Sequence, residues 1–179
     1  MDEAKGKAGK GEGMTKAYRV AILTVSDKGS RGEREDLSGS ALEEAILAQG
    51  WSVAARELVP DEEEAIAARL EHYCDELGVD LVLTTGGTGL SPRDVTPEAT
   101  RRVIHREAPG FAEAMRAASL AKTPHAMLSR AVSGMRGSTL IVNLPGSPRG
   151  ARENLEVILP ALPHGLDKLR GDGGECAVP

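Results

Sequence analysis

Apolar and polar positions along this chain fall into alternating blocks. Arg19 to Val25 is an almost continuous apolar run, and Asp80 to Thr84 is a second one. Such runs predict strands that are buried on both faces of a sheet. Trp51 to Val59 predicts a strand more weakly. Ala131 to Met135 and Ser138 to Val142 predict the two strands of a hairpin.

Helical spacing fills the segments between these strands. Ser38 to Gln49 has helical spacing and stops at a glycine, a common helix end. Asp61 to Leu77 is the clearest helix, with Asp61 and Glu64 at the spacing of a capping box. Further helices are predicted at Thr96 to His105, at Phe111 to Ala121 and from Ser147 onward. In the first and last of these, a Thr or Ser cap precedes a proline.

This order of elements predicts an α/β fold. Strands that alternate with helices form parallel βαβ units with helices on both faces of the sheet. The length of 179 residues fits one domain, which we place at residues 17–170. Residues 1–16 and 171–179 offer little to bury, which predicts a disordered leader and a flexible tail.

Composition narrows the classes of function. The formal charge is −5 and aromatic residues make up 2% of the chain, which argues against binding of nucleic acid or of a membrane surface. No apolar run approaches the length of a membrane span, and the N-terminus has no signal-peptide pattern. Cys74 and Cys176 offer no disulfide framework. We therefore expect a cytoplasmic protein with reduced thiols.

A polar loop follows each predicted parallel strand. These loops are Ser26 to Gly29, Pro60 to Glu62, Thr85 to Gly89 with Arg93 and Asp94 close behind, and Leu144 to Arg149. Ligands of open α/β sheets bind beyond the carboxyl ends of the strands, so we expect the four loops to share one edge. Their amides, hydroxyls, guanidinium groups and carboxylates suit phosphate and Mg²⁺.

Each part of this edge also has a plain structural interpretation. The glycine-rich segment could be only a tight turn, and it lacks the Gly-Lys-Ser/Thr of a Walker loop. Asp61 could be only a helix cap, and Asp94 could serve either a metal or a helix end. Ser147 is a plausible cap as well. The four histidines lack metal-ligand spacing, so a zinc site is not expected.

Thr84 to Gly89, followed by Arg93 to Thr100, resembles the signature of the MogA/MoaB family of molybdopterin-binding proteins. The G domain of gephyrin is an animal counterpart. Further segments that fit the resemblance are Ser26-Asp27, Pro60 to Glu62 and Leu144 to Pro148. The resemblance extends from about Tyr18 to Arg170, almost the whole predicted domain.

The resemblance implies a three-layer α/β/α fold with a mostly parallel sheet and a short antiparallel hairpin, assembled as a homotrimer or hexamer. It also implies molybdopterin adenylyltransferase activity, in which the terminal phosphate of molybdopterin attacks the α-phosphate of ATP and pyrophosphate leaves. By position, Asp61 and Asp94 match the carboxylates that handle Mg²⁺ and ATP. The other implied ligand-binding residues are Ser26, Asp27, Thr85, Gly86, Gly87, Thr88, Gly89, Arg93, Thr96, Pro145, Gly146, Ser147, Pro148 and Arg149. Lys28, Arg93 or Arg149 could offset the remaining phosphate charge.

Other functions are open at this point. Some members of the MoaB branch bind molybdopterin without adenylating it, and a scaffold would use its oligomeric surfaces alone. Metal insertion belongs to MoeA-type proteins, which have extra domains and are candidate partners. A CinA-like nucleotide hydrolase would use a similar turn but fits the segment after Arg93 poorly. Both acidic positions, Asp61 and Asp94, are filled, which favours the transferase.

Overall fold

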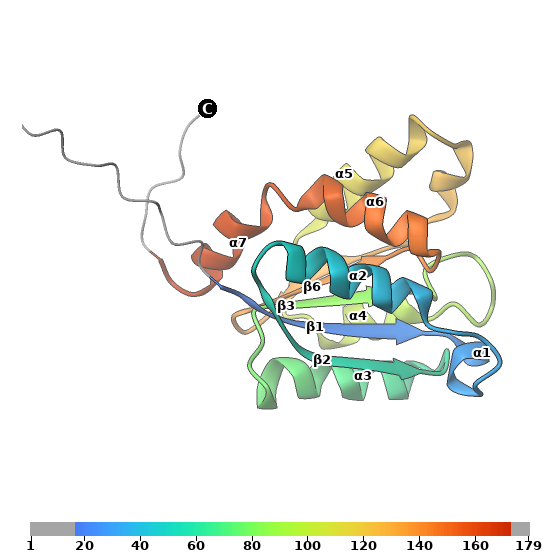
Figure 1. Cartoon of the computed structure of the whole chain (residues 1–179), viewed down its shortest axis with the longest axis horizontal. Coiled ribbons are helices and arrows are strands. Elements are labelled where there is room, and N and C mark those ends of the chain that lie inside the picture. The colour runs from blue at the N-terminus through green and yellow to red at the C-terminus, as the bar shows by residue number, and fades with distance from the viewer. Residues whose placement is uncertain (1–16, 173–179) are drawn as a thin grey trace, which may run out of the picture.

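The computed structural model describes residues 17–172 and contains one six-stranded sheet (Figure 1). The strand order is β2-β1-β3-β6-β5-β4. The strands are β1 (Arg19–Val25), β2 (Ser52–Val59), β3 (Leu81–Thr85), β4 (Arg106–Glu107), β5 (Ser133–Arg136) and β6 (Thr139–Leu144). The first four in this order run parallel, and β5 and β4 are antiparallel additions at one side. The predicted leader and nearly all of the predicted tail lie outside the described residues.

The central strands are the ones with continuous apolar runs. Every residue of β3 is buried, and so is every residue of β1 after Arg19. Burial on both faces explains why these runs lack a polar side. β2 alternates in exposure because it lies at the edge of the sheet. The predicted hairpin is confirmed as β5 and β6, paired from Ser133 with Val142 to Arg136 with Thr139.

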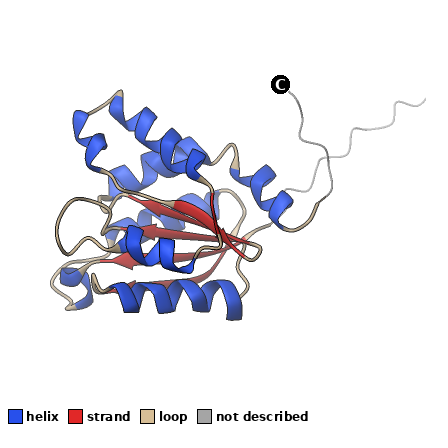
Figure 2. Ribbon diagram, turned by 180° about the vertical axis from the view of Figure 1, so that it is seen from behind, coloured by secondary structure: helices blue, strands red, loops and turns tan. Residues whose placement is uncertain are grey.

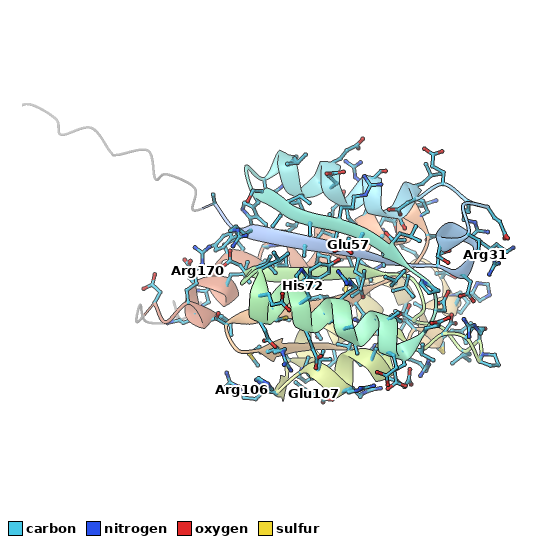
Figure 3. All side chains as sticks on the ribbon, turned by 90° about the horizontal axis from the view of Figure 1, so that it is seen from below. Arg31, Glu57, His72, Arg106, Glu107 and Arg170 are labelled. Atoms are coloured by element: carbon cyan, nitrogen blue, oxygen red, sulfur yellow. The ribbon has the colours of Figure 1, made fainter. Side chains whose placement is uncertain are left out.

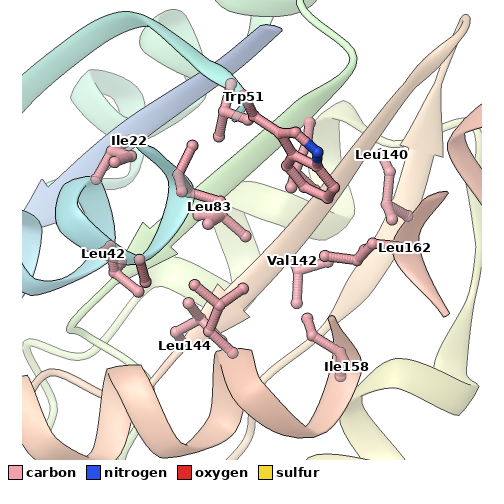
Figure 4. Close-up of a cluster of buried hydrophobic side chains, with 14 of the residues drawn as sticks. Ile22, Leu42, Trp51, Leu83, Leu140, Val142, Leu144, Ile158 and Leu162 are labelled. Atoms are coloured by element: carbon pink, nitrogen blue, oxygen red, sulfur yellow. The ribbon is translucent and has the colours of Figure 1, made fainter. Parts of the chain in front are cut away.

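Helices cover both faces of the sheet, which confirms the three-layer architecture (Figure 2). One face carries α2 (Leu37–Ala48), α5 (Pro109–Leu120), α6 (Pro148–Ile158) and α7 (Leu162–Leu169); the other carries α3 (Glu63–Glu71) and α4 (Thr96–Val103). The first face buries a cluster that includes Trp51, Leu42 and Leu162 (Figure 4). The second buries Ile66, Leu70 and neighbours against β1 and β3. Aliphatic side chains therefore form most of both cores, with Tyr18 and Trp51 in the first and Tyr73 in the second.

Two helix starts differ from the prediction. The capping box of Asp61 with Glu64 is wrong, since Glu62 precedes α3 and makes no side-chain cap. Thr96 is the first residue of α4 and not its cap. In both cases the side chain serves the tertiary structure instead: Asp61 accepts a backbone hydrogen bond from Asp27, and Thr96 donates to the Gly86 carbonyl.

Several short elements were not predicted. They are α1 (Asp27–Ser30), the short strand β4 and a 3-10 turn (η2, Pro124–Leu128). The predicted helix from Asp61 to Leu77 is confirmed as α3 and a π-helical turn that continues it (η1, His72–Glu76). The described helices are all too short or too polar to cross a membrane. The main consequence of the topology is that the carboxyl ends of β2, β1, β3 and β6 all lie along the same edge of the sheet, at right angles to the edge strand β2.

Candidate active site

A cleft of about 600 Å³ opens at this edge of the sheet. Its walls come from the ends of β1, β2 and β3 and from the loops that lead into α2, α4 and α6. The residues that line it are Thr24, Val25, Ser26, Gly29, Arg34, Glu35, Asp36, Leu37, Ser38, Leu58, Asp61, Thr85, Gly86, Gly87, Asp94, Gly146, Ser147 and Pro148. The cleft lies where the rule for open α/β sheets places a ligand.

Glycines shape the floor of the cleft. Gly86 has a φ of +102°, and a Cβ atom there would lie 2.2 Å from the Val25 carbonyl oxygen. Gly87 has a φ of +64°, and its Cβ would lie 2.3 Å from the Thr96 hydroxyl. Only glycine fits such positions without strain. The turn therefore exposes backbone to the cleft, which is how glycine-rich loops approach phosphate.

The loop before α6 closes against this turn. Thr85 donates its hydroxyl to the Pro145 carbonyl at 2.7 Å, and the Gly86 amide donates to the Leu144 carbonyl at 3.2 Å. Ser147 caps α6 by accepting a hydrogen bond from the Gly150 amide at 3.1 Å. The start of this 11-residue helix consequently lies beside the glycine-rich turn, where the helix dipole would stabilise an anion.

Asp61 lies at the end of β2 and is linked to Asp27 by two reciprocal bonds. The Asp27 amide donates to Asp61 Oδ2 at 2.8 Å, and the Asp61 amide donates to Asp27 Oδ1 at 3.0 Å. Burial raises the pKa of Asp61, and the negative charges of Asp27 and Asp94 raise it further. A carboxylate under such repulsion would bind a cation favourably.

Asp27 has the opposite electrostatic environment. Arg93 donates to both of its carboxylate oxygens, at 2.9 and 3.0 Å. This hydrogen bonding lowers the pKa of Asp27. Asp27 therefore has its counterion within the protein, whereas Asp61 forms no ion pair among the described residues.

Asp94 ends the loop that follows the glycine-rich turn. Its Oδ2 accepts a hydrogen bond from the Ser91 amide at 3.0 Å, and the same atom would lie 2.8 Å from a Cβ at Gly89. Asp94 lines the same cleft as Asp61. The two carboxylates thus approach the cleft from different loops.

One wall of the cleft was not expected from the sequence. It is the segment from Arg34 to Ser38, which leads from α1 into the first two residues of α2. Asp36 fixes this wall: it accepts hydrogen bonds from the Thr24 hydroxyl at 2.9 Å and the Gly39 amide at 2.8 Å, and it pairs with Arg56. Arg34 is the one Lys or Arg side chain among the described residues that line the cleft. The Asp-x-Ser-Gly helix start was the available sequence signal.

A second hollow of about 290 Å³ adjoins the cleft between α5, η2 and α6. The two share Ser147, and Pro145 lines only the second. Its polar lining includes Ser119, Lys122 and Asn154. The start of α6 consequently separates two neighbouring spaces. The first is lined by four acidic residues and Arg34, and the second by Arg116, Lys122 and His125 with Glu153 as its one acidic residue among those described.

Comparison with known families settles the relationship. The family model described as "Probable molybdopterin binding domain" matches residues 21–164. The chain belongs to this family. The match covers all the loops that line the cleft.

Individual members of the molybdopterin-binding family agree with this assignment. A protein named molybdopterin adenylyltransferase from Helicobacter pylori strain J99 is 44% identical over 155 residues, with 86% of this chain and 88% of that protein covered. Gephyrin of Dictyostelium discoideum is 45% identical over 82% of this chain, which corresponds to 22% of gephyrin. A crystal structure named molybdopterin biosynthesis enzyme MoaB from Thermus thermophilus is 58% identical, with a TM-score of 0.82 and coverage of 86% of this chain and 97% of that one.

The structure separates the residues expected from the family resemblance into two groups. Nine of them line the cleft: Ser26, Asp61, Thr85, Gly86, Gly87, Asp94, Gly146, Ser147 and Pro148. The others lie behind it or beside it: Asp27, Thr88, Gly89, Arg93, Thr96, Pro145 and Arg149. Arg93 and Arg149 pair with Asp27 and Glu153. Thr88 and Thr96 are buried.

A bound Mg²⁺ would fit this family site through Asp61 and Asp94. Magnesium commonly takes one or two protein carboxylates and completes its shell with water and substrate phosphate. No group of three or more His, Cys, Asp or Glu side chains within residues 17–172 could hold a metal. Burial and then the negative charges of Asp27 and Asp94 raise the pKa of Asp61, and a divalent cation would offset that negative charge.

Proposed function

We propose that this protein is a molybdopterin adenylyltransferase of molybdenum cofactor biosynthesis. The observation that carries the proposal is the shared cleft of Asp61 and Asp94, placed against a glycine turn and the start of α6. The 44% identity to relatives named molybdopterin adenylyltransferase supports the same reaction. ATP is the proposed donor and Mg²⁺ the proposed metal.

The proposed reaction needs no nucleophilic side chain. A terminal phosphate oxygen of molybdopterin forms a bond to the α-phosphorus of ATP, while the bond from that phosphorus to the bridging oxygen of the β-phosphate breaks. Pyrophosphate leaves with that oxygen. The protein must therefore position two anions and stabilise the charge that develops between them. Asp61 and Asp94 would hold Mg²⁺, which supplies positive charge to the ATP phosphates.

The two neighbouring hollows support a division between the two substrates. We place ATP in the larger cleft with the carboxylates, and the pterin in the smaller hollow lined by Ser119 and Asn154. The reacting phosphates would then meet at Ser147, which both spaces share. Arg34 would face the ATP phosphates, so Arg34→Gln is expected to raise the KM for ATP about tenfold, measured against an unchanged KM for molybdopterin.

A direct assay tests the proposed function. Purified protein is incubated with molybdopterin, Mg²⁺ and ATP, and adenylated molybdopterin and pyrophosphate are measured. Wild type is expected to form both, and Asp94→Asn is expected to bind molybdopterin but to lose most turnover. Glu64→Gln is a matched control, because Glu64 pairs with Arg102 and does not line the cleft. Full turnover in Asp94→Asn would contradict the role of this carboxylate.

The second candidate is a binding protein without transferase activity. It is kept because the structure that is 58% identical is named molybdopterin biosynthesis enzyme MoaB, a name that states no adenylyl transfer, whereas the transferase from Helicobacter pylori is 44% identical. The same assay separates the two candidates. Tight binding of molybdopterin without adenylated product would leave a carrier or assembly role, with the ligand correct and the reaction wrong.

We also propose a homo-oligomer that acts in the cytoplasm. A hollow of about 360 Å³ between α5 and α6 is lined almost entirely by apolar residues, including Phe111 and Val157. Apolar surface of this kind supports self-association. Sedimentation equilibrium would distinguish the 18.8 kDa chain from a trimer or hexamer. We likewise propose a MoeA-type insertase as a partner that receives the product.

A further inference from the structure

Arg130 connects the body of the domain to the loop that carries Asp94. It lies between η2 and β5, and its backbone amide donates to the Thr88 carbonyl at 2.8 Å. Its guanidinium donates to the Gly89 carbonyl at 2.7 Å and to the Asp94 carbonyl at 2.6 Å. The same group forms an ion pair with Glu98 in the first turn of α4. One side chain thus holds both ends of the Asp94 loop.

The loop has few other attachments to the domain. The bonds between Ser91 and Asp94 are internal, so they shape the loop without fixing its position. Arg93 provides a second attachment through its two hydrogen bonds to Asp27, but its side chain is 58% exposed, so solvent screens this ion pair. The guanidinium of Arg130 is planar, and its N–H groups point in fixed directions. Three acceptors on one such group define the loop position more narrowly than a single bond would.

The environment of Glu98 indicates that its contact with Arg130 serves to position the Asp94 loop. Burial acts to raise the pKa of Glu98, but hydrogen bonding and the positive charges of Arg130 and Arg101 together outweigh it and lower the pKa below its usual value. The second carboxylate oxygen of Glu98 is buried and has no hydrogen-bond partner among the described residues. An acceptor atom that is shielded from solvent and lacks a hydrogen bond costs stability. A more precisely fixed Asp94 loop offers a reason to retain the ion pair of Glu98 with Arg130.

We infer that Arg130 is a positioning residue, which holds Asp94 where it can bind the metal and its nucleotide. The inference rests on the proposed function. Arg130 is absent from the residues described as lining the cleft, so it acts through Asp94 and not on substrate. Residues that orient metal ligands commonly change metal affinity by about 10- to 100-fold, which is the effect expected here.

The test compares wild type with Arg130→Met and Arg130→Lys. Arg130→Met is expected to raise the Mg²⁺ concentration required for half-maximal turnover at least about tenfold, and to lower kcat by about 10²-fold. The KM for molybdopterin is expected to stay within about twofold, since the pterin hollow keeps its lining. Arg130→Lys keeps the positive charge but loses the planar guanidinium that donates to several acceptors at once, so an intermediate effect is expected. Guanidinium ion, at concentrations too low to unfold the protein, is expected to restore part of the activity of Arg130→Met.

Arg136→Met is the matched control. Arg136 donates to the Val103 carbonyl at 2.9 Å, at the other end of α4, and pairs with Asp75 at 2.6 Å. It is expected to lower the melting temperature at an unchanged Mg²⁺ requirement. If Arg130→Met behaves like this control, with a lower melting temperature and a wild-type Mg²⁺ requirement, the inference is overturned.

A turnover-independent measurement separates this inference from the proposed function. Mn²⁺ binding in the presence of ATP is followed by water-proton relaxation for wild type and Arg130→Met. If wild type binds Mn²⁺ and ATP but forms no adenylated pterin, the transferase proposal fails, while weaker Mn²⁺ binding by the variant still supports the positioning role. If wild type binds neither, the positioning role falls as well.

Discussion

At the amino end of the sheet Asp80 lies against a basic partner, whereas at the carboxyl end Asp61 forms no ion pair among the described residues. Arg170 donates to both carboxylate oxygens of Asp80 at 2.7 Å, and the Arg19 amide adds a bond at 2.8 Å. Burial acts to raise the pKa of Asp80, but these bonds and the positive charges of Arg170 and Arg19 together outweigh it and lower the pKa. Asp75, near the same end, is paired with Arg136.

The two ends are well separated in the molecule. Figure 3 labels Arg170 at one end of the sheet and Arg31, beside α1, at the other. Pairing at the amino end joins the last helix to the sheet and stabilises the fold. At the carboxyl end Asp61 is left with a raised pKa beside other carboxylates, which costs stability. The contrast teaches that unpaired charge in this fold marks the surface kept for a ligand.

The largest effect is expected from a substitution at the carboxyl end of the sheet, where Asp61 lies. Asp61→Asn is expected to lower turnover by about 10²-fold or more, because the metal loses a carboxylate where negative charge develops. Initial rates of pyrophosphate release measure the effect. Glu62→Gln, next in the chain but absent from the residues described as lining the cleft, is the control. Equal rates for Asp61→Asn and Glu62→Gln would remove Asp61 from the proposed site.

A smaller effect is expected at the structural end. Asp80→Asn removes the charge that holds Arg170 and is expected to destabilise the protein by about 1–3 kcal/mol. Urea unfolding followed by circular dichroism measures the loss. Turnover well below the melting temperature should stay at the wild-type rate. A variant that keeps its stability but loses activity would reverse the assignment of the two ends.

The smallest expected effect is a difference in pH dependence. The raised pKa of Asp61 means that the native state holds its proton above the unfolded pKa of 3.8, so stability falls as pH rises through the folded pKa. Asp61→Asn should therefore match wild type in strong acid and be slightly more stable at neutral pH, by less than about 1 kcal/mol.

Asp80 has a lowered pKa, so its contribution to the free energy of unfolding is present above the unfolded pKa of 3.8 and is lost as pH falls through the folded pKa. The stability deficit of Asp80→Asn should accordingly shrink in acid. Urea midpoints across this pH range would show opposite trends, and parallel trends would contradict the comparison.

Much of this architecture could be predicted from the sequence, because the central strands are locally encoded. Continuous apolar runs identify β1 and β3, and parallel strands must end at one edge. That rule alone predicts that Asp61, Asp94 and Ser147 share an edge of the sheet. The glycine-rich turn is also visible in the sequence, because it directly follows the apolar run of β3.

Features that depend on tertiary neighbours could not be predicted. Arg93 and Arg149 were expected to offset phosphate charge, but their ion-pair partners lie on surfaces that only folding creates. Arg34 lies in a polar stretch without periodicity, and it reaches the cleft because β1 lies between β2 and β3. Arg130 gave no sequence signal at all, since its acceptors are carbonyl groups more than 30 residues away.

Ser147 lies at the boundary of both hollows, and this has a consequence for the release of product. An adenylated pterin would occupy both spaces at once, so its two halves would bind as a tethered pair. Once one half is bound, the effective concentration of the other is high, and affinity exceeds that of either half alone. Dissociation of the product, and not bond formation, is then expected to set the rate of turnover. A protein that takes the product directly from the cleft would relieve this limit.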